Sequence, residues 1–203
     1  PWGEDLWAGV SSSGSGVATA AGLCFGSLGT DTGGSIRYPA MANGIVGLKP
    51  TYGRVSRHGV LELAGSLDHV GPMTRSVKDA AIMLEAIAGY DVSDASSLDV
   101  AVPKICDALT DDLSSIRVGV DERYLSNGTN SGLVDALHQA IEVLAQLGAQ
   151  IVEIAMPESD PMNLRNAWLP ICAYEAARAH AANYPSRVNE YGGYFGDALK
   201  LGA

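Results

Sequence analysis

The chain has 203 residues, of which 47% are apolar and 18% are charged, and its net charge is −10. This length suffices for one sizeable core or for part of a larger one. The 13 basic residues are scattered, and there is no run of about eighteen apolar residues, so neither a nucleic-acid footprint nor a membrane span is expected.

The first half of the chain predicts short elements separated by glycine- and serine-rich loops. Residues 15–25 are small and mostly apolar after a polar stretch, which is typical of a tightly packed helix. Residues 25–30 predict a short buried strand, and residues 45–48 form another apolar run that stops at a proline. Ser76, with Asp79 three positions later, predicts a helix start, and apolar residues at helical spacing then follow.

The second half has the pattern of a βαβ unit. The Asp- and Ser-rich residues 91–115 predict an exposed connection. A strand, an amphipathic helix and a second strand are predicted next, at residues 117–120, 133–147 and 150–155. An alanine-rich helix is predicted over residues 167–182, with Pro170 as a kink or boundary, and no closing element is predicted after it. The fold class is therefore α/β.

Two serine-rich loops carry the most informative chemistry. They are Gly9-Val10-Ser11-Ser12-Ser13-Gly14-Ser15-Gly16 and Gly29-Thr30-Asp31-Thr32-Gly33-Gly34-Ser35-Ile36-Arg37. A serine attacks a carbonyl only when a base takes its proton and hydrogen-bond donors receive the developing negative charge. Glycines before Ser35 allow several backbone N–H groups to converge on one point. Acyl transfer is thus indicated, although most Gly-Gly-Ser tripeptides are ordinary solvated turns.

Other motifs built from glycine and serine do not fit. A phosphate-binding loop ends in Gly-Lys-Ser/Thr, but Gly14 is followed by Ser15, and the first lysine is Lys49. No serine has glycine at both −2 and +2, so the hydrolase nucleophile elbow is absent. The third glycine of a dinucleotide fingerprint is also missing. Spacing alone leaves a Ser-His-Asp triad open.

The two loops and the segments that follow resemble the amidase signature family in order and spacing. The later segments are Gly47-Leu48-Lys49-Pro50-Thr51-Tyr52-Gly53-Arg54-Val55-Ser56 and Ser66-Leu67-Asp68-His69-Val70-Gly71-Pro72-Met73. The resemblance covers residues 9–91, and residues 92–203 continue its α/β pattern. It implies a partial amidase domain over residues 1–203, with a mixed β-sheet core covered by helices on both faces.

By that resemblance, Ser35 is the nucleophile that is acylated, and Ser11 is the serine of the Ser-cisSer-Lys triad that relays its proton. The two serines lie 24 residues apart, as in the family. The amides of Thr32, Gly33 and Gly34 would form the oxyanion hole.

Asp31 and Arg37 flank this turn, and they are predicted to hold it by charge-assisted hydrogen bonds. Ion pairs with other partners are an equal alternative for both.

The third member of the triad, a lysine, lies upstream of both serines in the family, and no lysine precedes Lys49 here. Lys49 stands downstream of the nucleophile and is interpreted as structural. The N-terminal part with the catalytic lysine and a C-terminal part are therefore expected outside these 203 residues, which alone should be inactive. A degenerate, non-catalytic relative is the alternative.

The resemblance implies hydrolysis of a small-molecule carboxamide to a carboxylic acid and ammonia or an amine, without a metal or an organic cofactor. The alternative within the family is the glutaminase-type component of a tRNA-dependent amidotransferase. Such components often carry Gln after Ser-Ile-Arg and Cys-Gly before Val-Val-Gly, where this chain has Tyr38 and Asn43-Gly44. The oligomeric state, a homo-oligomer included, is left open.

The three cysteines, Cys24, Cys106 and Cys172, are far apart and lack metal-type spacing. They predict a reducing compartment, the cytoplasm, and no zinc site. The first residues show neither a basic region nor an apolar one, so no signal peptide is expected.

Overall fold

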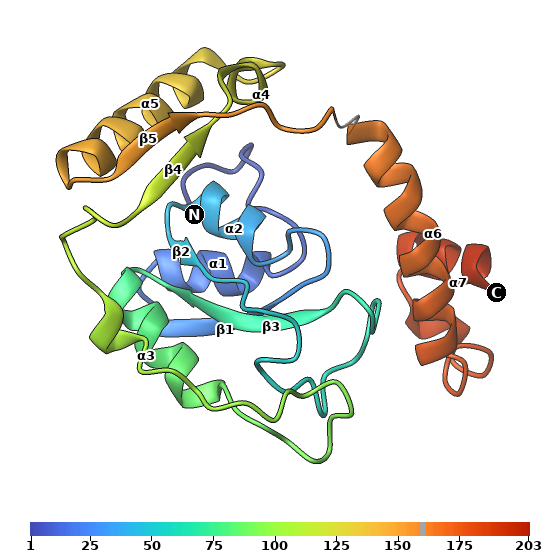
Figure 1. Ribbon diagram of the computed structural model, residues 1–203. Coiled ribbons are helices and arrows are strands. Elements are labelled where there is room, and N and C mark those ends of the chain that lie inside the picture. The colour runs from blue at the N-terminus through green and yellow to red at the C-terminus, as the bar shows by residue number, and fades with distance from the viewer. Residues whose placement is uncertain (159–160) are drawn as a thin grey trace. The chain divides into compact units, whose positions relative to one another are not determined.

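The computed structural model describes residues 1–158 and 161–203. These residues form two compact units, one made of Pro1–Asp107 with Met162–Ala203 and the other of Ala108–Pro161. The first unit contains an antiparallel sheet with strand order β1-β3-β2 (Figure 1). Its strands are β1 Gly26–Asp31, β2 Val46–Gly47 and β3 His69–Thr74.

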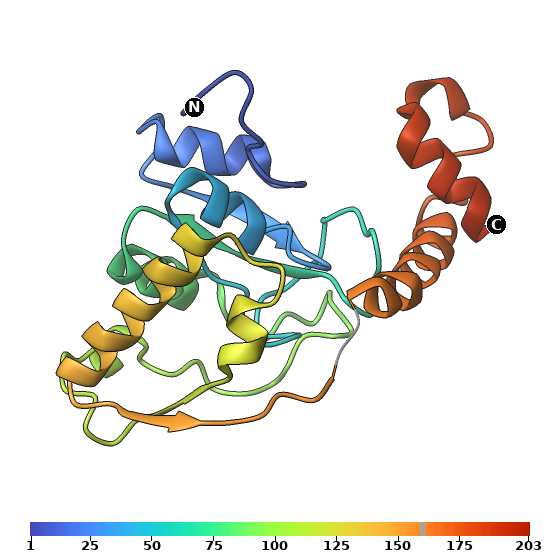
Figure 2. The ribbon, with the colours of Figure 1, turned by 90° about the horizontal axis from the view of Figure 1, so that it is seen from above.

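Helices cover both faces of this sheet. They are α1 Ser13–Ala20, α2 Arg37–Asn43 and α3 Val77–Ile87. Met73 of β3 packs with Ile36 and Ala40 at α2, whereas Val70 of the same strand packs with Leu84 of α3. Side chains an odd number of positions apart on a strand point to opposite faces, so these two clusters lie on opposite sides of the sheet. Figures 1 and 2 show α1 beside α2.

The α3 helix begins as the sequence predicts. The Ser76 hydroxyl accepts a hydrogen bond from the Asp79 amide at 3.1 Å and donates one to the Asp79 carboxylate at 2.7 Å. This reciprocal cap satisfies a backbone donor that has no partner inside the helix. The helix then buries Ala80, Ala81 and Leu84 against the sheet.

The second unit confirms the predicted βαβ order. Strands β4 Arg117–Val120 and β5 Gln150–Glu153 are parallel neighbours, and the helices α4 Glu122–Ser126 and α5 Ser131–Gln146 lie between them in sequence. Asp121 links the two strand ends, because its carboxylate accepts bonds from the Tyr124 amide at 3.1 Å and the Met156 amide at 2.7 Å.

The C-terminal segment differs from the sequence prediction. Helix α6 Pro161–Ala179 continues through Pro170, and a further helix, α7 Gly193–Gly202, follows where no closing element was predicted. The prediction that no element follows α6 was wrong. The glycines at residues 193–202 lower helix propensity, but the buried Leu199 and Gly196 favour α7 through packing. The described residues also form two short 3₁₀ helices, at Cys106–Ala108 and Val188–Glu190.

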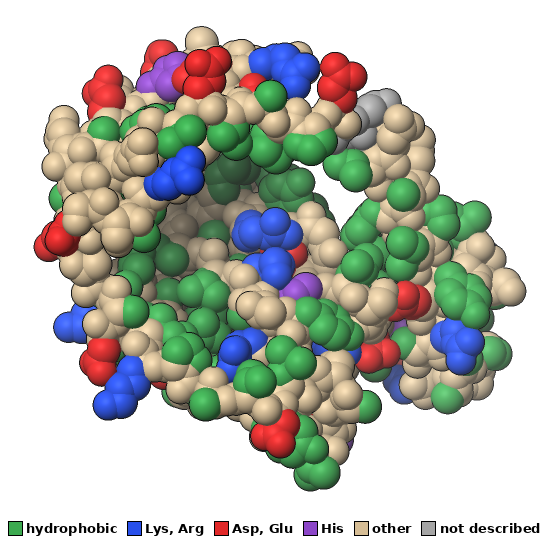
Figure 3. Space-filling view, in the orientation of Figure 1, with side chains coloured by type: hydrophobic (Ala, Val, Ile, Leu, Met, Phe, Trp, Pro, Cys, Tyr) green, Lys and Arg blue, Asp and Glu red, His purple; other side chains and the backbone are tan. Residues whose placement is uncertain are grey.

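The surface carries many apolar side chains. In Figure 3 they lie between charged groups over one face of the molecule. Phe25 is 92% exposed and Leu23 is 79% exposed. Among the helices of the described residues, none has the length and apolar character needed to cross a bilayer.

Candidate active site

The turn at residues 32–35, between β1 and α2, is folded around a buried carboxylate. Asp31, the last residue of β1, is 1% exposed. It accepts hydrogen bonds from the Gly34 amide at 2.7 Å and the Ile36 amide at 3.2 Å. The Arg37 guanidinium adds two bonds, at 3.0 Å from Nε and 2.9 Å from Nη2. Asp31 and Arg37 are therefore paired with each other across the turn.

Electrostatics keep this carboxylate ionised. Burial opposes the charged form, but hydrogen bonds from Arg37, Ile36 and Gly34 outweigh it and lower the pKa of Asp31. The same bond to Asp31 raises the pKa of Arg37. The ion pair between Asp31 and Arg37 thus stabilises the conformation of the turn.

Gly34 has the backbone conformation that the turn requires. Its φ is +131°, and a Cβ at this position would lie 2.2 Å from a ring carbon of Tyr38. Because the Gly34 N–H donates to Asp31, it is directed into the turn. In the part of the chain that the structure describes, the Gly33 and Ser35 amides donate to no acceptor.

A second buried carboxylate holds the other end of the turn. The Thr32 hydroxyl donates to Asp68 Oδ1 at 2.5 Å. Asp68 comes just before β3, and it faces Thr32 because Asp31 pairs with His69 in the register of β1 and β3. Asp68 stands within a segment that matches the family pattern, but the sequence alone indicated no role for it.

An aromatic side chain from α6 covers the turn. Trp168 Nε1 donates to the Thr32 carbonyl at 3.3 Å. The indole lies so close to Gly33 that a Cβ there would stand 2.9 Å from Nε1. Helix α6 therefore packs against the turn through Trp168.

The two serine-rich loops lie side by side. The Ser12 amide donates to the Ser35 carbonyl at 3.3 Å. The Ser12 hydroxyl also accepts from the Thr30 amide at 3.1 Å, so it fixes the loop against β1. The Val10–Ser11 peptide bond is cis. Ser11 is exposed and Ser35 is half-buried, and neither hydroxyl is hydrogen-bonded to another described residue.

Lys49 and His69, which lie in the later signature segments, are hydrogen-bonded to groups other than the two serines. Lys49 Nζ donates to the Pro50 carbonyl at 2.7 Å, which is a contact within its own loop. His69 Nδ1 lies 2.6 Å from the Leu67 carbonyl oxygen. None of the histidines within the described ranges is hydrogen-bonded to Ser11 or Ser35, so the residues described here form no Ser-His pair at this site.

Residues 1–194 match the profile of the family described as Amidase. The chain belongs to the amidase family. Its likeness to the family continues beyond the signature region at residues 9–91, because the match covers most of both units. Membership agrees with the α/β architecture found above.

Two curated relatives of this amidase-family chain have the same percentage identity to it over different lengths. It is 49% identical over 193 residues to the protein assigned as amidase AmiD in Mycobacterium tuberculosis, covering 95% of this chain and 40% of that protein. It is also 49% identical over 159 residues to a glutamyl-tRNA(Gln) amidotransferase component of Syntrophobacter fumaroxidans, covering 78% of this chain and 33% of that protein. The chain therefore spans less than half of either relative.

A solved structure supports the fold. The peptide amidase from Stenotrophomonas maltophilia superposes with a TM-score of 0.77 at 34% identity, covering 95% of this chain and 43% of that enzyme. The present fold is thus part of an amidase-signature domain.

Proposed function

We propose that the protein containing this chain hydrolyses a carboxamide through an acyl-enzyme formed on Ser35. The observation that carries the proposal is the turn at residues 32–35. Asp31 folds it so that the Gly33 and Ser35 amides lack a described acceptor and stand beside a half-buried serine hydroxyl. Such an arrangement provides a nucleophile and donors for negative charge in one place.

In the proposed reaction, the Ser35 hydroxyl attacks the amide carbonyl carbon, and its proton passes through Ser11 to a general base. The negatively charged oxygen is received by amides of the turn, each worth about 3–4 kcal/mol of transition-state stabilisation. We assign these donors to Thr32 and Gly33, with the Ser35 amide beside them. Gly34 contributes by shaping the hole, because its own N–H already donates to Asp31.

The second half of the reaction restores the serine. The C–N bond breaks as the proton returns through Ser11 to the leaving ammonia or amine. Water then attacks the acyl group on Ser35 and releases a carboxylic acid. The proposed general base is the upstream lysine that the family resemblance implies. The only lysine in the signature segments, Lys49, donates to the Pro50 carbonyl. We place the enzyme in the cytoplasm on its three free, widely spaced cysteines.

The test is ammonia release by the full-length protein from aliphatic, aryl and amino-acid amides, with glutamine included. We expect Ser35→Ala to lower the rate by about 10⁴-fold or more. Ser13→Ala is the matched control, because Ser13 lies in the same serine-rich loop as Ser11 and its hydroxyl makes no hydrogen bond to a described residue. Its rate should stay within about twofold.

Two results would change the proposal. Hydrolysis that survives Ser35→Ala contradicts the nucleophile assignment. Hydrolysis of glutamine alone favours the amidotransferase-type function, a role named for the relative from Syntrophobacter fumaroxidans, and would replace the general amidase proposed here.

A further inference from the structure

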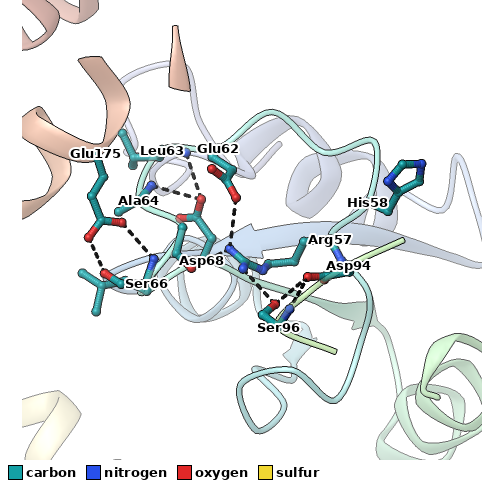
Figure 4. A network of polar contacts seen from close by, with 12 residues as sticks. Arg57, His58, Glu62, Leu63, Ala64, Ser66, Asp68, Asp94, Ser96 and Glu175 are labelled. Carbon is teal, nitrogen blue, oxygen red and sulfur yellow. Dashed lines mark hydrogen bonds and ion pairs between the residues drawn. The ribbon is translucent and has the colours of Figure 1, made fainter. Parts of the chain in front are cut away.

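Asp68 joins two parts of the chain that are far apart in sequence. Its side chain is buried, with the residue 6% exposed. Oδ2 accepts bonds from the Leu63 amide at 2.9 Å and the Ala64 amide at 3.0 Å, as Figure 4 shows. Oδ1 accepts from the Thr32 hydroxyl at 2.5 Å. One carboxylate thus binds both the loop at residues 62–66 and the turn at residues 32–35.

The loop at residues 62–66 is itself held from two other directions. Arg57 Nη1 and the Tyr52 hydroxyl both donate to the Gly65 carbonyl, at 2.7 Å and 2.6 Å. On the far side of the loop, Glu175 of α6 accepts from the Ser66 amide at 2.8 Å and from its hydroxyl at 2.6 Å (Figure 4). Asp68 is therefore supported by a loop whose own position is fixed.

The Asp68 carboxylate has little freedom to move. A buried carboxylate is costly unless donors satisfy it, and three donors do so here. The bond to Asp68 fixes the Thr32 side chain. Because the side chain is attached at Cα, this bond also restricts the rotation of the backbone at residue 32. Asp31 holds the following part of the turn through the Gly34 and Ile36 amides.

We infer that Asp68 is a positioning residue for the oxyanion hole, acting through the Thr32 hydroxyl. This inference rests on the proposed function. Asp68 holds the Thr32 side chain, Trp168 donates to the Thr32 carbonyl, and Asp31 accepts from the amides of residues 34 and 36. The two carboxylates together set where the donors point, and a displacement of about 1 Å in such a site lowers the rate by about 100-fold.

The decisive variants alter the hydroxyl and leave the backbone amide in place. Thr32→Val removes the bond to Asp68, whereas Thr32→Ser keeps it. We expect Thr32→Val to lower kcat by about 10- to 100-fold with KM within about threefold, because the hole acts on the transition state. Thr32→Ser should retain kcat within about threefold.

A double-variant cycle tests the route through Asp68. In Asp68→Asn the single remaining oxygen is expected to serve the Leu63 and Ala64 amides, so an N–H faces the Thr32 hydroxyl and the bond donated by Thr32 is lost. This variant should lower kcat as Thr32→Val does, and the double variant should be no slower than the slower single variant, because both remove the bond that Thr32 donates to residue 68. Glu62→Gln is the matched control, since Glu62 lies in the loop at residues 62–66 and its carboxylate pairs with Arg57 at 3.7 Å, with no hydrogen bond or ion pair to Thr32 among the described residues. It should leave kcat and KM unchanged.

The positioning role is overturned if Thr32→Val keeps the wild-type kcat, or if the two single effects multiply in the double variant. If Asp68→Asn does not fold, the Thr32→Val and Thr32→Ser pair decides alone. If the wild type hydrolyses no amide, the proposed function fails, and hydrogen exchange across residues 31–37 tests the positioning separately. Exchange should be faster in Thr32→Val and unchanged in Glu62→Gln, and equal exchange in both overturns it.

Discussion

Replacing Asp31 by Asn tests how much the inner carboxylate contributes to the turn. Asp31→Asn keeps the side-chain shape but exchanges one acceptor oxygen for an N–H donor. Oδ1 serves the Gly34 amide and Arg37 Nη2, and Oδ2 serves the Ile36 amide and Arg37 Nε. Whichever oxygen is lost, a buried backbone donor faces another donor.

The magnitude follows from these contacts. A buried donor left without an acceptor costs about 1–3 kcal/mol. The lost ion pair adds less, about 1 kcal/mol or below, because the Arg37 side chain is 54% exposed and water can replace its partner. We therefore expect Asp31→Asn to lower the free energy of unfolding by about 2–4 kcal/mol, and to lower the hydrolysis rate as the turn loosens.

Urea denaturation of the two proteins at pH 7 measures this difference directly. Asp99→Asn is the control, since Asp99 is exposed and forms no ion pair or hydrogen bond in the part of the chain described. That substitution should change the free energy of unfolding by less than about 0.5 kcal/mol. A loss below about 1 kcal/mol for Asp31→Asn would show that Asp31 does not organise the turn.

Three further predictions follow from the same structure. Because the pKa of Asp31 lies below its ordinary value of 3.8, its contribution is present above pH 3.8 and is lost as pH falls through the lowered value. The Asp31→Asn penalty should therefore be largely unchanged at pH 4.5 and shrink in stronger acid, as urea titrations across pH will show. Ser76→Ala should cost about 1 kcal/mol of unfolding free energy, since the Asp79 amide loses its cap. Burial, with the nearby charges of Asp68 and Glu175, raises the pKa of Cys172 to about 11, so peptide mapping should find this thiol alkylated by iodoacetamide at pH 8 only after unfolding.

Local sequence signals predicted the elements that depend on local chemistry. The cap at Ser76 and the apolar spacing after it define α3, and the βαβ pattern predicted β4, α5 and β5 close to their observed bounds. These elements depend on periodicity and end groups that the sequence displays directly.

Two elements that depend on tertiary contacts, β3 and α2, were not predicted from the sequence. Strand β3 contains Gly71 and Pro72, which disfavour strands, yet it is the central strand and pairs with both β1 and β2. Helix α2 carries Pro39 in its first turn, where a missing N–H does no harm. In both cases pairing or packing with distant residues outweighs local propensity.

The candidate site divides in the same way. Asp31, Ser35 and Arg37 stand within one short motif, so the sequence alone could connect them. The contact between Thr32 and Asp68 joins residues 36 positions apart, and Trp168 reaches Thr32 across 136 positions. Only the strand register and the placement of α6 bring these groups to the turn.

Covalent labelling of the full-length protein tests whether Ser35 is the nucleophile. A fluorophosphonate probe reacts with an activated serine, and peptide mapping then identifies the modified residue. We expect a single adduct on Ser35 that disappears in Ser35→Ala and persists in Ser13→Ala. An adduct on another residue, or labelling that survives Ser35→Ala, would contradict it.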